Sequence, residues 1–303
     1  KLFDREGNTL VLRPDITPSI ARCVAKYHKN DELPLRLCYT GNTFINSSEY
    51  QGKSKELTQT GAELINDASA VADAEMLALT VECLLAAGLK EFQVEVGEVG
   101  FFKAIVEEAG IQDEYLEELM LLINDKNSFG LEAFLNNFKL SKELNSIFAM
   151  LPTMFGSIDK LDEFKIMTGN NEAIAAIERL EQIYALMKLY GYEKYVSFDL
   201  GMLSKFGYYT GIIFNAYTYG LGDTLISGGR YDKLVGQFGK DAPAVGMAVF
   251  VDRLLSAVMR QGIGSESKEA VHVFASSEEH CEEELKKVIA LRKAGKAARL
   301  DIK

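Results

Sequence analysis

The stretch from Leu57 to Ile65 reads LTQTGAELI and combines a strand-like pattern with an unusual polar face. On a β-strand alternate residues share a face, so Gln59, Gly61 and Glu63 point one way and the residues between them point the other. The first face is polar, with a gap at its centre. At about 3.3 Å per residue, Gln59 and Glu63 lie about 13 Å apart along such a strand. A small amino acid lying over Gly61 fits this floor, and a solvent-exposed polar strand face is the alternative.

A second polar segment, LRPDITP, runs from residue 12 to residue 18. Its two prolines restrict the backbone, and Asp15 and Thr17 can present an acceptor and a hydroxyl in one direction. Thr17 followed by Pro18 is also typical of a helix N-terminus with Thr17 as the N-cap. The segment therefore predicts a ligand contact, a helix start, or both.

Two glycine-flanked segments follow in the C-terminal half. FGYYTG, residues 206–211, places Tyr208 and Tyr209 just before a predicted strand. Adjacent side chains on a strand face opposite sides, so one tyrosine can line a pocket while the other packs. SGGRYD, residues 227–232, has paired glycines that let a backbone approach a ligand, although most such pairs form turns.

The composition is that of a globular protein with an acidic balance. The 303 residues are 48% hydrophobic and 25% charged, and 33 Lys and Arg against 44 Asp and Glu give a net charge of -11. This charge argues against a general binder of nucleic-acid backbones, although a local basic patch would suffice for one. The sequence contains no run of about 18 uncharged apolar residues, so it predicts no membrane-spanning helix. The chain begins in the middle of a pattern at Lys1, so the sequence leaves open whether a targeting leader precedes it.

The cysteine and histidine content favours a reducing compartment and argues against a metal site. Four scattered cysteines without a CxxC pair lie among apolar neighbours, which predicts buried free thiols in a cytoplasmic protein. Only three histidines are present, which leaves little from which to build a histidine-rich zinc site or a Ser-His-Asp triad. We expect no metal and no cofactor.

The residue pattern divides the chain into four parts. Residues 1–100 and 191–261 combine short strands with a few helices. Between them, residues 101–190 carry amphipathic stripes, which we interpret as the packing faces of a helical insertion. Residues 269–303 follow a polar linker with a β-α-β pattern and form part of a small α/β domain. The predicted elements are strands at 36–45, 57–65, 92–96 and 211–217, and helices at 73–88 and 251–259. The fold class is α+β, a largely antiparallel sheet flanked by helices.

Together and in this order, the four segments resemble the catalytic core of histidyl-tRNA synthetase, a class II aminoacyl-tRNA synthetase. LRPDIT resembles the LRPEGT segment of that family, and residues 39–63 resemble its motif 2 and histidine-pocket strand. GYYTG resembles its second histidine signature, and residues 227–253 resemble the approach to motif 3. The likeness covers most of residues 10–100 and 195–258. It implies the class II synthetase-like antiparallel sheet.

The resemblance implies a histidine pocket. The residues it assigns to histidine binding are Asp15, Thr17, Gln59, Glu63, Tyr208 and Tyr209. The first three would hold the α-amino end, and Glu63 with Tyr208 would face the imidazole. A neutral imidazole offers one donor and one acceptor, so a carboxylate and a phenol are suitable partners. Asp15 is one methylene shorter than the glutamate of the family and would reshape the site.

Three departures from the family pattern concern the nucleotide. Ile45 stands where motif 2 has an arginine, and Ser204 stands where the second signature has another. Phe250 replaces a small glycine of motif 3, although Arg253 is kept. Adenylate formation needs cations on the phosphates as charge develops. The departures therefore imply that no residue is catalytic and that the chain is not an enzyme.

A synthetase-like fold without these arginines is similar to the regulatory subunit of ATP phosphoribosyltransferase. FDLG at residues 198–201 and RPDITPSIAR at residues 13–22 fit this family better than a true synthetase. The resemblance implies a cytoplasmic regulatory subunit that supports the short-form catalytic subunit in the first step of histidine biosynthesis. It also implies feedback inhibition by histidine, self-association as a dimer and a hetero-octamer of both subunits, with neither nucleic acid nor a membrane as partner.

Several alternatives stay open at this point. Histidine can bind in the synthetase-like pocket, which the retained Gln59, Glu63 and Tyr208 favour, or at an interface between subunits. An active histidyl-tRNA synthetase requires other cations in place of the missing arginines. A synthetase-like amino-acid sensor or RNA-binding paralogue of another system is the second rival, and the acidic charge argues against RNA.

Overall fold

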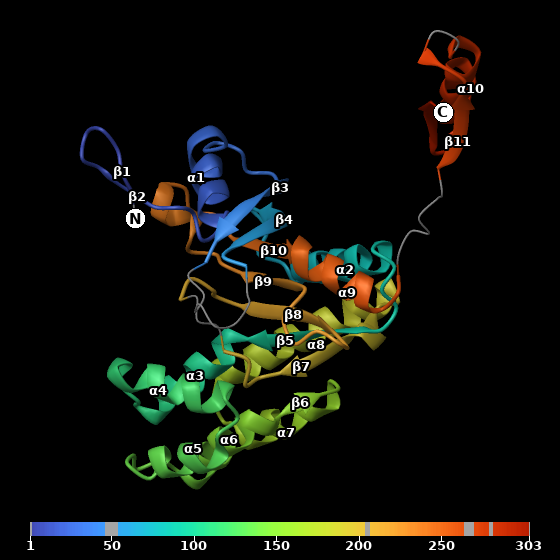
Figure 1. Ribbon diagram of the computed structural model, residues 1–303. Helices are drawn as coiled ribbons and strands as arrows, with labels where there is room; N and C mark the ends of the chain where they lie inside the picture. Colours follow the sequence, from blue (N-terminus) through green and yellow to red (C-terminus); the bar gives the residue numbers. More distant parts are fainter. Residues whose placement is uncertain (1, 46–53, 204–206, 264–269, 279–280, 303) are drawn as a thin grey trace. The chain divides into compact units, whose positions relative to one another are not determined.

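The computed structural model describes residues 2–45, 54–203, 207–263, 270–278 and 281–302, and it falls into two units, Lys1–Gln261 and Gly262–Lys303. Within the described residues, the first unit is built around an eight-stranded sheet of order β3-β4-β10-β9-β8-β5-β7-β6 (Figure 1). Its strands are β3 (Leu35–Phe44), β4 (Glu56–Ile65), β5 (Phe92–Glu98), β6 (Phe155–Gly156), β7 (Val196–Asp199), β8 (Ile212–Thr218), β9 (Ile226–Arg230) and β10 (Ala244–Phe250).

The predicted antiparallel sheet is confirmed with one exception. Neighbouring strands run antiparallel, apart from β5 and β7, which run parallel. A separate two-stranded hairpin, β1 (Leu2–Phe3) with β2 (Thr9–Leu10), precedes the sheet in sequence. The four predicted strands correspond to β3, β4, β5 and β8, each shifted by a residue or two at its ends.

Helices of the first unit lie where helical periodicity predicts them, apart from α1 (Thr17–Tyr27), for which the sequence predicts only a possible start at Thr17 and Pro18. They are α1 (Thr17–Tyr27), α2 (Ala70–Ala86), α3 (Val99–Ala109), α4 (Asp113–Asn124), α5 (Ser128–Leu135), α6 (Lys142–Met150), α7 (Asp159–Met167), α8 (Asn171–Tyr190) and α9 (Val251–Arg260), with short 3-10 turns η2 (Leu151–Thr153), η3 (Glu193–Tyr195) and η4 (Val235–Phe238). The predicted insertion, residues 101–190, lies within the first unit. Its helix α8 packs along α2 and against β5 (Figure 1).

The amphipathic stripes predicted from the sequence form core. On α4, Leu119 and Ile123 are buried, and on α8 the same holds for Ile177, Leu180, Ile183 and Met187. Burying an aliphatic side chain of this size contributes roughly 1.5–3 kcal/mol. Burial of these side chains therefore stabilises the packing of both helices.

The second unit has the predicted β-α-β pattern. Strand β11 (Val271–Ala275) pairs in parallel with β12 (Ala298–Ile302), and α10 (Glu282–Lys293) connects them. This order confirms the small C-terminal α/β fragment.

The expectation of buried cysteines is wrong. All four cysteines are free, but Cys23 and Cys38 are exposed and Cys83 and Cys281 are partly exposed. Cys38 lies on the edge strand β3, in the row of alternate residues that faces outward. In the part of the chain that the structure describes, no helix is long and apolar enough to cross a membrane.

Candidate ligand-binding site

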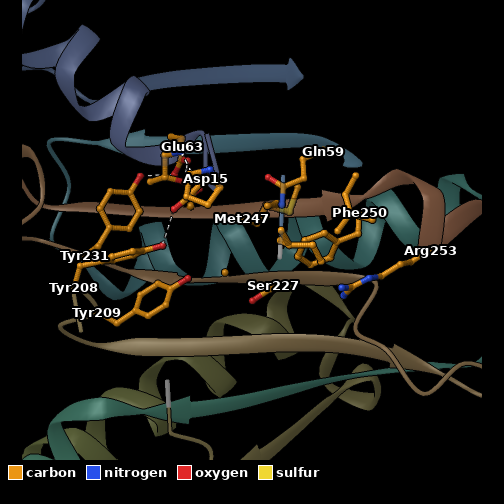
Figure 2. Close-up of a pocket in the computed structure, with 17 residues that line it drawn as sticks. Asp15, Gln59, Glu63, Tyr208, Tyr209, Ser227, Tyr231, Met247, Phe250 and Arg253 are labelled. Atoms are coloured by element: carbon orange, nitrogen blue, oxygen red, sulfur yellow. Dashed lines mark hydrogen bonds between the residues drawn. The ribbon is translucent and has the colours of Figure 1, made fainter. Parts of the chain in front are cut away.

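A cavity of about 200 Å³ opens on the sheet and takes residues from distant parts of the sequence (Figure 2). It is smaller than the roughly 300–1,000 Å³ of pockets that bind drug-sized ligands. All six predicted site residues line it: Asp15, Thr17, Gln59, Glu63, Tyr208 and Tyr209. The structure therefore brings the predicted set together in a space suited to a ligand of amino-acid size.

Two neighbouring strands form the floor of the cavity. Along β4, Gln59, Gly61 and Glu63 are buried on one face, as the alternation predicts. Strand β10 runs antiparallel beside it, so that Phe250 lies opposite Gln59 and Gly246 lies opposite Glu63. The cavity consequently has two ends, one at Glu63 and one at Gln59.

A side chain of the neighbouring strand fills the gap over Gly61. Tyr39 of β3 lies opposite Gly61, and a Cβ atom at Gly61 would collide with the Tyr39 ring and with the Met247 carbonyl oxygen. The prediction of a ligand lying over Gly61 is therefore wrong, because a side chain of the neighbouring strand takes this place. The cavity lies beside Gly61, along β10.

Glu63 is the chemical centre of one end. Its side chain is 2% exposed, and its Oε1 accepts a hydrogen bond of 2.9 Å from the Thr17 hydroxyl. Oε2 accepts a short hydrogen bond from the Tyr231 phenol. Burial raises the pKa of Glu63 to about 8, and the two hydroxyl donors only partly offset that effect. Gly246 makes room for this carboxyl group, since a Cβ atom there would collide with Oε2.

Thr17 belongs to the site and does not cap its helix. The residue before α1 is Ile16, which makes no side-chain cap, and Pro18 occupies the first turn as predicted. The Thr17 hydroxyl is directed to Glu63, so the ligand-site interpretation fits and the N-cap interpretation is wrong. Its backbone N–H donates to Asp15 Oδ1 at 3.1 Å.

Both tyrosines of the GYYTG segment line the cavity. Their ring centres are 4.7 Å apart, and the Tyr208 phenol donates to Asp15 Oδ2 at 3.3 Å. The expectation that one tyrosine lines the pocket while the other packs elsewhere is wrong, because β8 begins only at Ile212 and strand alternation does not apply to the turn before it. Asp15 and Thr17 thus contact Tyr208 and Glu63 directly, at the same end of the cavity.

The other end of the cavity combines an unsatisfied acceptor with a cation. Gln59 is 7% exposed, and its Oε1 has no hydrogen-bond partner among the described residues. The Arg253 guanidinium lies 4.2 Å from the centre of the Phe250 ring, and Ile45 also lines this end. The Ser204 position, named above as a lost arginine, lies outside the described residues.

Tyr231 is the site residue that sequence reasoning missed. It lies in the quoted SGGRYD segment directly after Arg230, and only its contact with Glu63 reveals its role. The paired glycines before it belong to strand β9, and Gly228 lines the cavity. The available signal was an aromatic residue two positions after the glycine pair.

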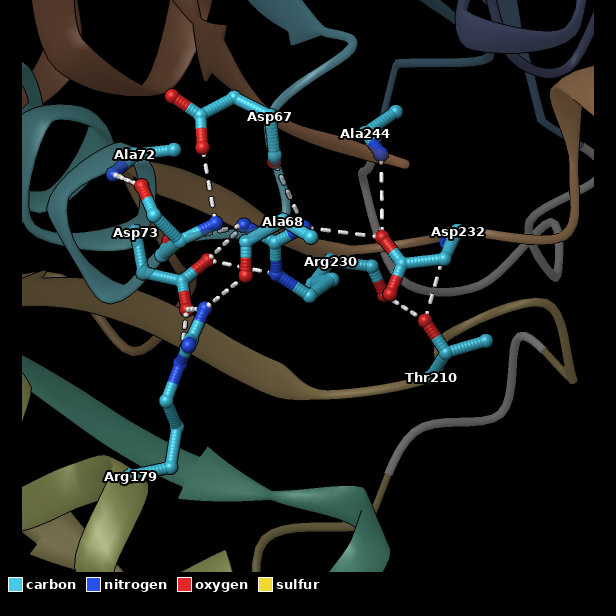
Figure 3. A network of polar contacts seen from close by, with 10 residues as sticks. Asp67, Ala68, Ala72, Asp73, Arg179, Thr210, Arg230, Asp232 and Ala244 are labelled. Carbon is cyan, nitrogen blue, oxygen red and sulfur yellow. Dashed lines mark hydrogen bonds and ion pairs between the residues drawn. The ribbon is translucent and has the colours of Figure 1, made fainter. Parts of the chain in front are cut away.

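A network of hydrogen bonds and ion pairs connects the tyrosine turn, residues 207–211, to the rest of the fold (Figure 3). Thr210 donates its backbone N–H to the Arg230 carbonyl oxygen at 2.8 Å, and its hydroxyl accepts from the Asp232 N–H at 3.0 Å. The Arg230 guanidinium pairs with the buried Asp73 of α2 at 2.7 Å. Asp73 also pairs with Arg179 of α8 at 2.7 Å. The turn that carries Tyr208 is therefore connected to two helices.

The chain matches known proteins over most of its length. The family model described as "Histidyl-tRNA synthetase" matches residues 1–254. An ATP phosphoribosyltransferase regulatory subunit of Clostridium acetobutylicum is 42% identical over 282 residues, covering 91% of this chain and 69% of the relative. One of Acetivibrio thermocellus is 38% identical over 302 residues, covering 100% of this chain and 72% of the relative. This chain therefore spans about seven tenths of the length of these relatives.

Solved structures give the same result for the fold. A crystal structure from Bacillus halodurans, described as an ATP phosphoribosyltransferase regulatory subunit/histidyl-tRNA synthetase, superposes with a TM-score of 0.87 at 34% identity, covering 99% of this chain and 76% of that one. Histidyl-tRNA synthetase from Nostoc reaches a TM-score of 0.79 at 20% identity over 96% of this chain and 70% of that one, which shows the fold alone. The chain belongs to the family of ATP phosphoribosyltransferase regulatory subunits, which is built on the histidyl-tRNA synthetase fold.

Proposed function

We propose that this chain activates the short-form catalytic subunit of ATP phosphoribosyltransferase and that its cavity binds histidine as the feedback inhibitor. The observation that carries the proposal is the cavity itself. It holds carboxyl and phenol groups at one end, at Glu63 and Tyr208, and a buried amide oxygen without a partner among the described residues at the other, at Gln59. These groups match an imidazole side chain and an α-ammonium group.

The residues at the Gln59 end of the cavity favour a regulatory role over synthetase activity. Ile45 lines the cavity in place of a cation, and the Phe250 ring packs against Arg253 within it. An apolar side chain cannot stabilise the charge that develops on a phosphate during adenylate formation.

The regulation acts through differential affinity. Histidine bound at the cavity favours one arrangement of the complex, and that arrangement turns over less substrate. The network from Thr210 through Arg230 and Asp73 to Arg179 offers a physical connection between the tyrosine turn and the helical segment. The proposed assembly is a dimer of this chain within a cytoplasmic hetero-octamer.

The test is a phosphoribosyltransferase assay of the short catalytic subunit with and without this protein, each with and without histidine. We expect activation by this protein and inhibition by histidine of the activated enzyme. The Glu63→Gln variant should still activate, but inhibition should require more histidine because the imidazole loses the Glu63 carboxyl group as a partner. Light scattering of the mixture measures the proposed stoichiometry.

Two controls separate the rivals. ATP–pyrophosphate exchange by this protein alone should be absent, and histidine-dependent exchange would restore the synthetase hypothesis. A transferase that is indifferent to this protein would favour an amino-acid sensor of another system. If this protein activates the transferase but histidine has no effect, the catalytic subunit is its partner and histidine is not its effector.

A further inference from the structure

The cavity has one acidic end and one cationic end. Asp15 and Glu63 lie at the first, together with the tyrosines. Arg253 is the one cationic side chain among the described residues that line the cavity. In Figure 2 its guanidinium points from α9 into the cavity, toward the Phe250 ring. This polarity matches an amino acid, which carries a negative group at one end.

The Arg253 guanidinium is held in position by two contacts. Its Nη1 donates to the carbonyl oxygen and to the hydroxyl of Thr224, at 2.9 Å each. The guanidinium carbon lies over the Phe250 ring, 4.2 Å from its centre. Among the described residues, no hydrogen-bond partner occupies Nε or Nη2. Because Nε–H and Nη2–H form the fork that binds a carboxylate with two parallel hydrogen bonds, the guanidinium is oriented and free for such a ligand.

Gln59 shows where the neighbouring group of the ligand lies. Gln59 of β4 pairs with Phe250 of β10. Phe250 stands three residues before Arg253 in the sequence. The buried Oε1 of Gln59 has no partner among the described residues and is therefore available to accept a hydrogen bond from a ligand. An α-ammonium group supplies the donor, and the α-carboxylate is attached to the same carbon atom.

We propose that Arg253 binds the α-carboxylate of the bound histidine while Gln59 accepts from its α-ammonium group. The inference rests on the proposed histidine binding and adds the residue that binds the carboxylate of the ligand. The backbone of the amino acid lies at the Phe250 end, and its side chain extends toward Glu63, which is four residues further along β4. Arg253 therefore distinguishes an amino acid from an analogue that lacks the carboxylate.

The experiment is isothermal titration calorimetry of the full chain with histidine and with histidinol, which has a hydroxymethyl group in place of the carboxylate. We expect the unsubstituted protein to bind histidine roughly 10- to 100-fold more tightly than histidinol, the range of a charge-assisted hydrogen-bond pair. Arg253→Met should weaken histidine binding by that factor and leave histidinol binding unchanged, so that the affinity ratio falls to about 1. Arg253→Lys, which keeps the charge without the fork, should retain an intermediate ratio.

Arg260→Met is the matched control. Arg260 lies on the same helix, but it donates to the Gly220 carbonyl oxygen and does not line the cavity. This variant should keep the full ratio. Arg253 variants that weaken both ligands equally, or that leave the ratio intact, would overturn the assignment of the carboxylate. If the unsubstituted protein binds neither ligand, the proposed effector function itself fails, which is a distinct result.

Discussion

At the scale of single residues, Glu63 makes stability depend on pH. Its ordinary pKa of 4.5 rises to about 8 in the fold because the side chain is fully buried. The folded state therefore holds the proton more tightly than the unfolded chain. The stabilising contribution of protonated Glu63 is complete below about pH 4.5 and is lost as the pH rises toward 8.

Glu63→Gln should remove this dependence. The amide keeps the shape of the side chain and stays neutral, so the variant should gain stability relative to the parent as the pH rises from 5 to 8. Each unit of pKa shift corresponds to about 1.4 kcal/mol, which makes a difference of a few kcal/mol expected. Urea unfolding at pH 5, 7 and 8.5 measures it, with the exposed Glu117→Gln as control. Parallel curves for Glu63→Gln and the parent would contradict the prediction.

Tyr231→Phe should destabilise the fold by about 1–3 kcal/mol. The substitution removes the phenol that donates to Glu63 Oε2 and leaves a buried carboxyl oxygen without that donor. Chemical denaturation measures the loss. Tyr219→Phe is the control because Tyr219 is 61% exposed, and its stability should match that of the parent. Equal stability of both variants would show that the Tyr231 hydroxyl contributes little.

At the scale of elements, Asp73 joins α2 to β9 and α8 through two guanidinium groups. Arg230→Met should cost about 3–5 kcal/mol because it leaves a buried carboxylate with one partner fewer. Arg179→Met should cost less, since the Arg179 side chain is 26% exposed and water replaces part of its interaction. Urea unfolding of both variants gives the order.

A double variant tests whether the charge pair causes the loss. Arg230→Met with Asp73→Leu removes both charges and should be more stable than Arg230→Met alone. If the losses in Arg230→Met and in Asp73→Leu add up to the loss in the double variant, the effect is due to packing instead.

The ends of elements show where local signals suffice. The sequence predicts a helix over residues 73–88 from its apolar spacing, and α2 begins earlier, at Ala70. The Ser69 hydroxyl caps that helix by accepting from the Ala72 N–H at 3.2 Å. Gly88, the predicted stop, follows the last turn with a φ of 94°. Periodicity therefore identified the helix, while a single hydrogen bond decided its start.

At the scale of the whole molecule, the described residues that line the cavity all belong to the first unit. These lining residues lie between Pro14 and Arg253, and the first unit extends to Gln261. A chain truncated after Gln261 should therefore fold and bind histidine with the affinity of the full chain. Circular dichroism and calorimetry measure both properties. Loss of binding by a folded truncated chain would show that residues 262–303 contribute to the site.

The sequence by itself determined the fold class, the face of β4 that carries Gln59 and Glu63, and six of the residues that line the cavity. These features follow from local periodicity and from motifs whose residue types are visible in the chain. Tertiary structure alone decided which groups meet. Tyr39 fills the space over Gly61 because β3 lies beside β4, and Tyr231 reaches Glu63 because β9 and β4 flank β10. Such contacts depend on the order of strands in the sheet, which alternation along one strand does not encode.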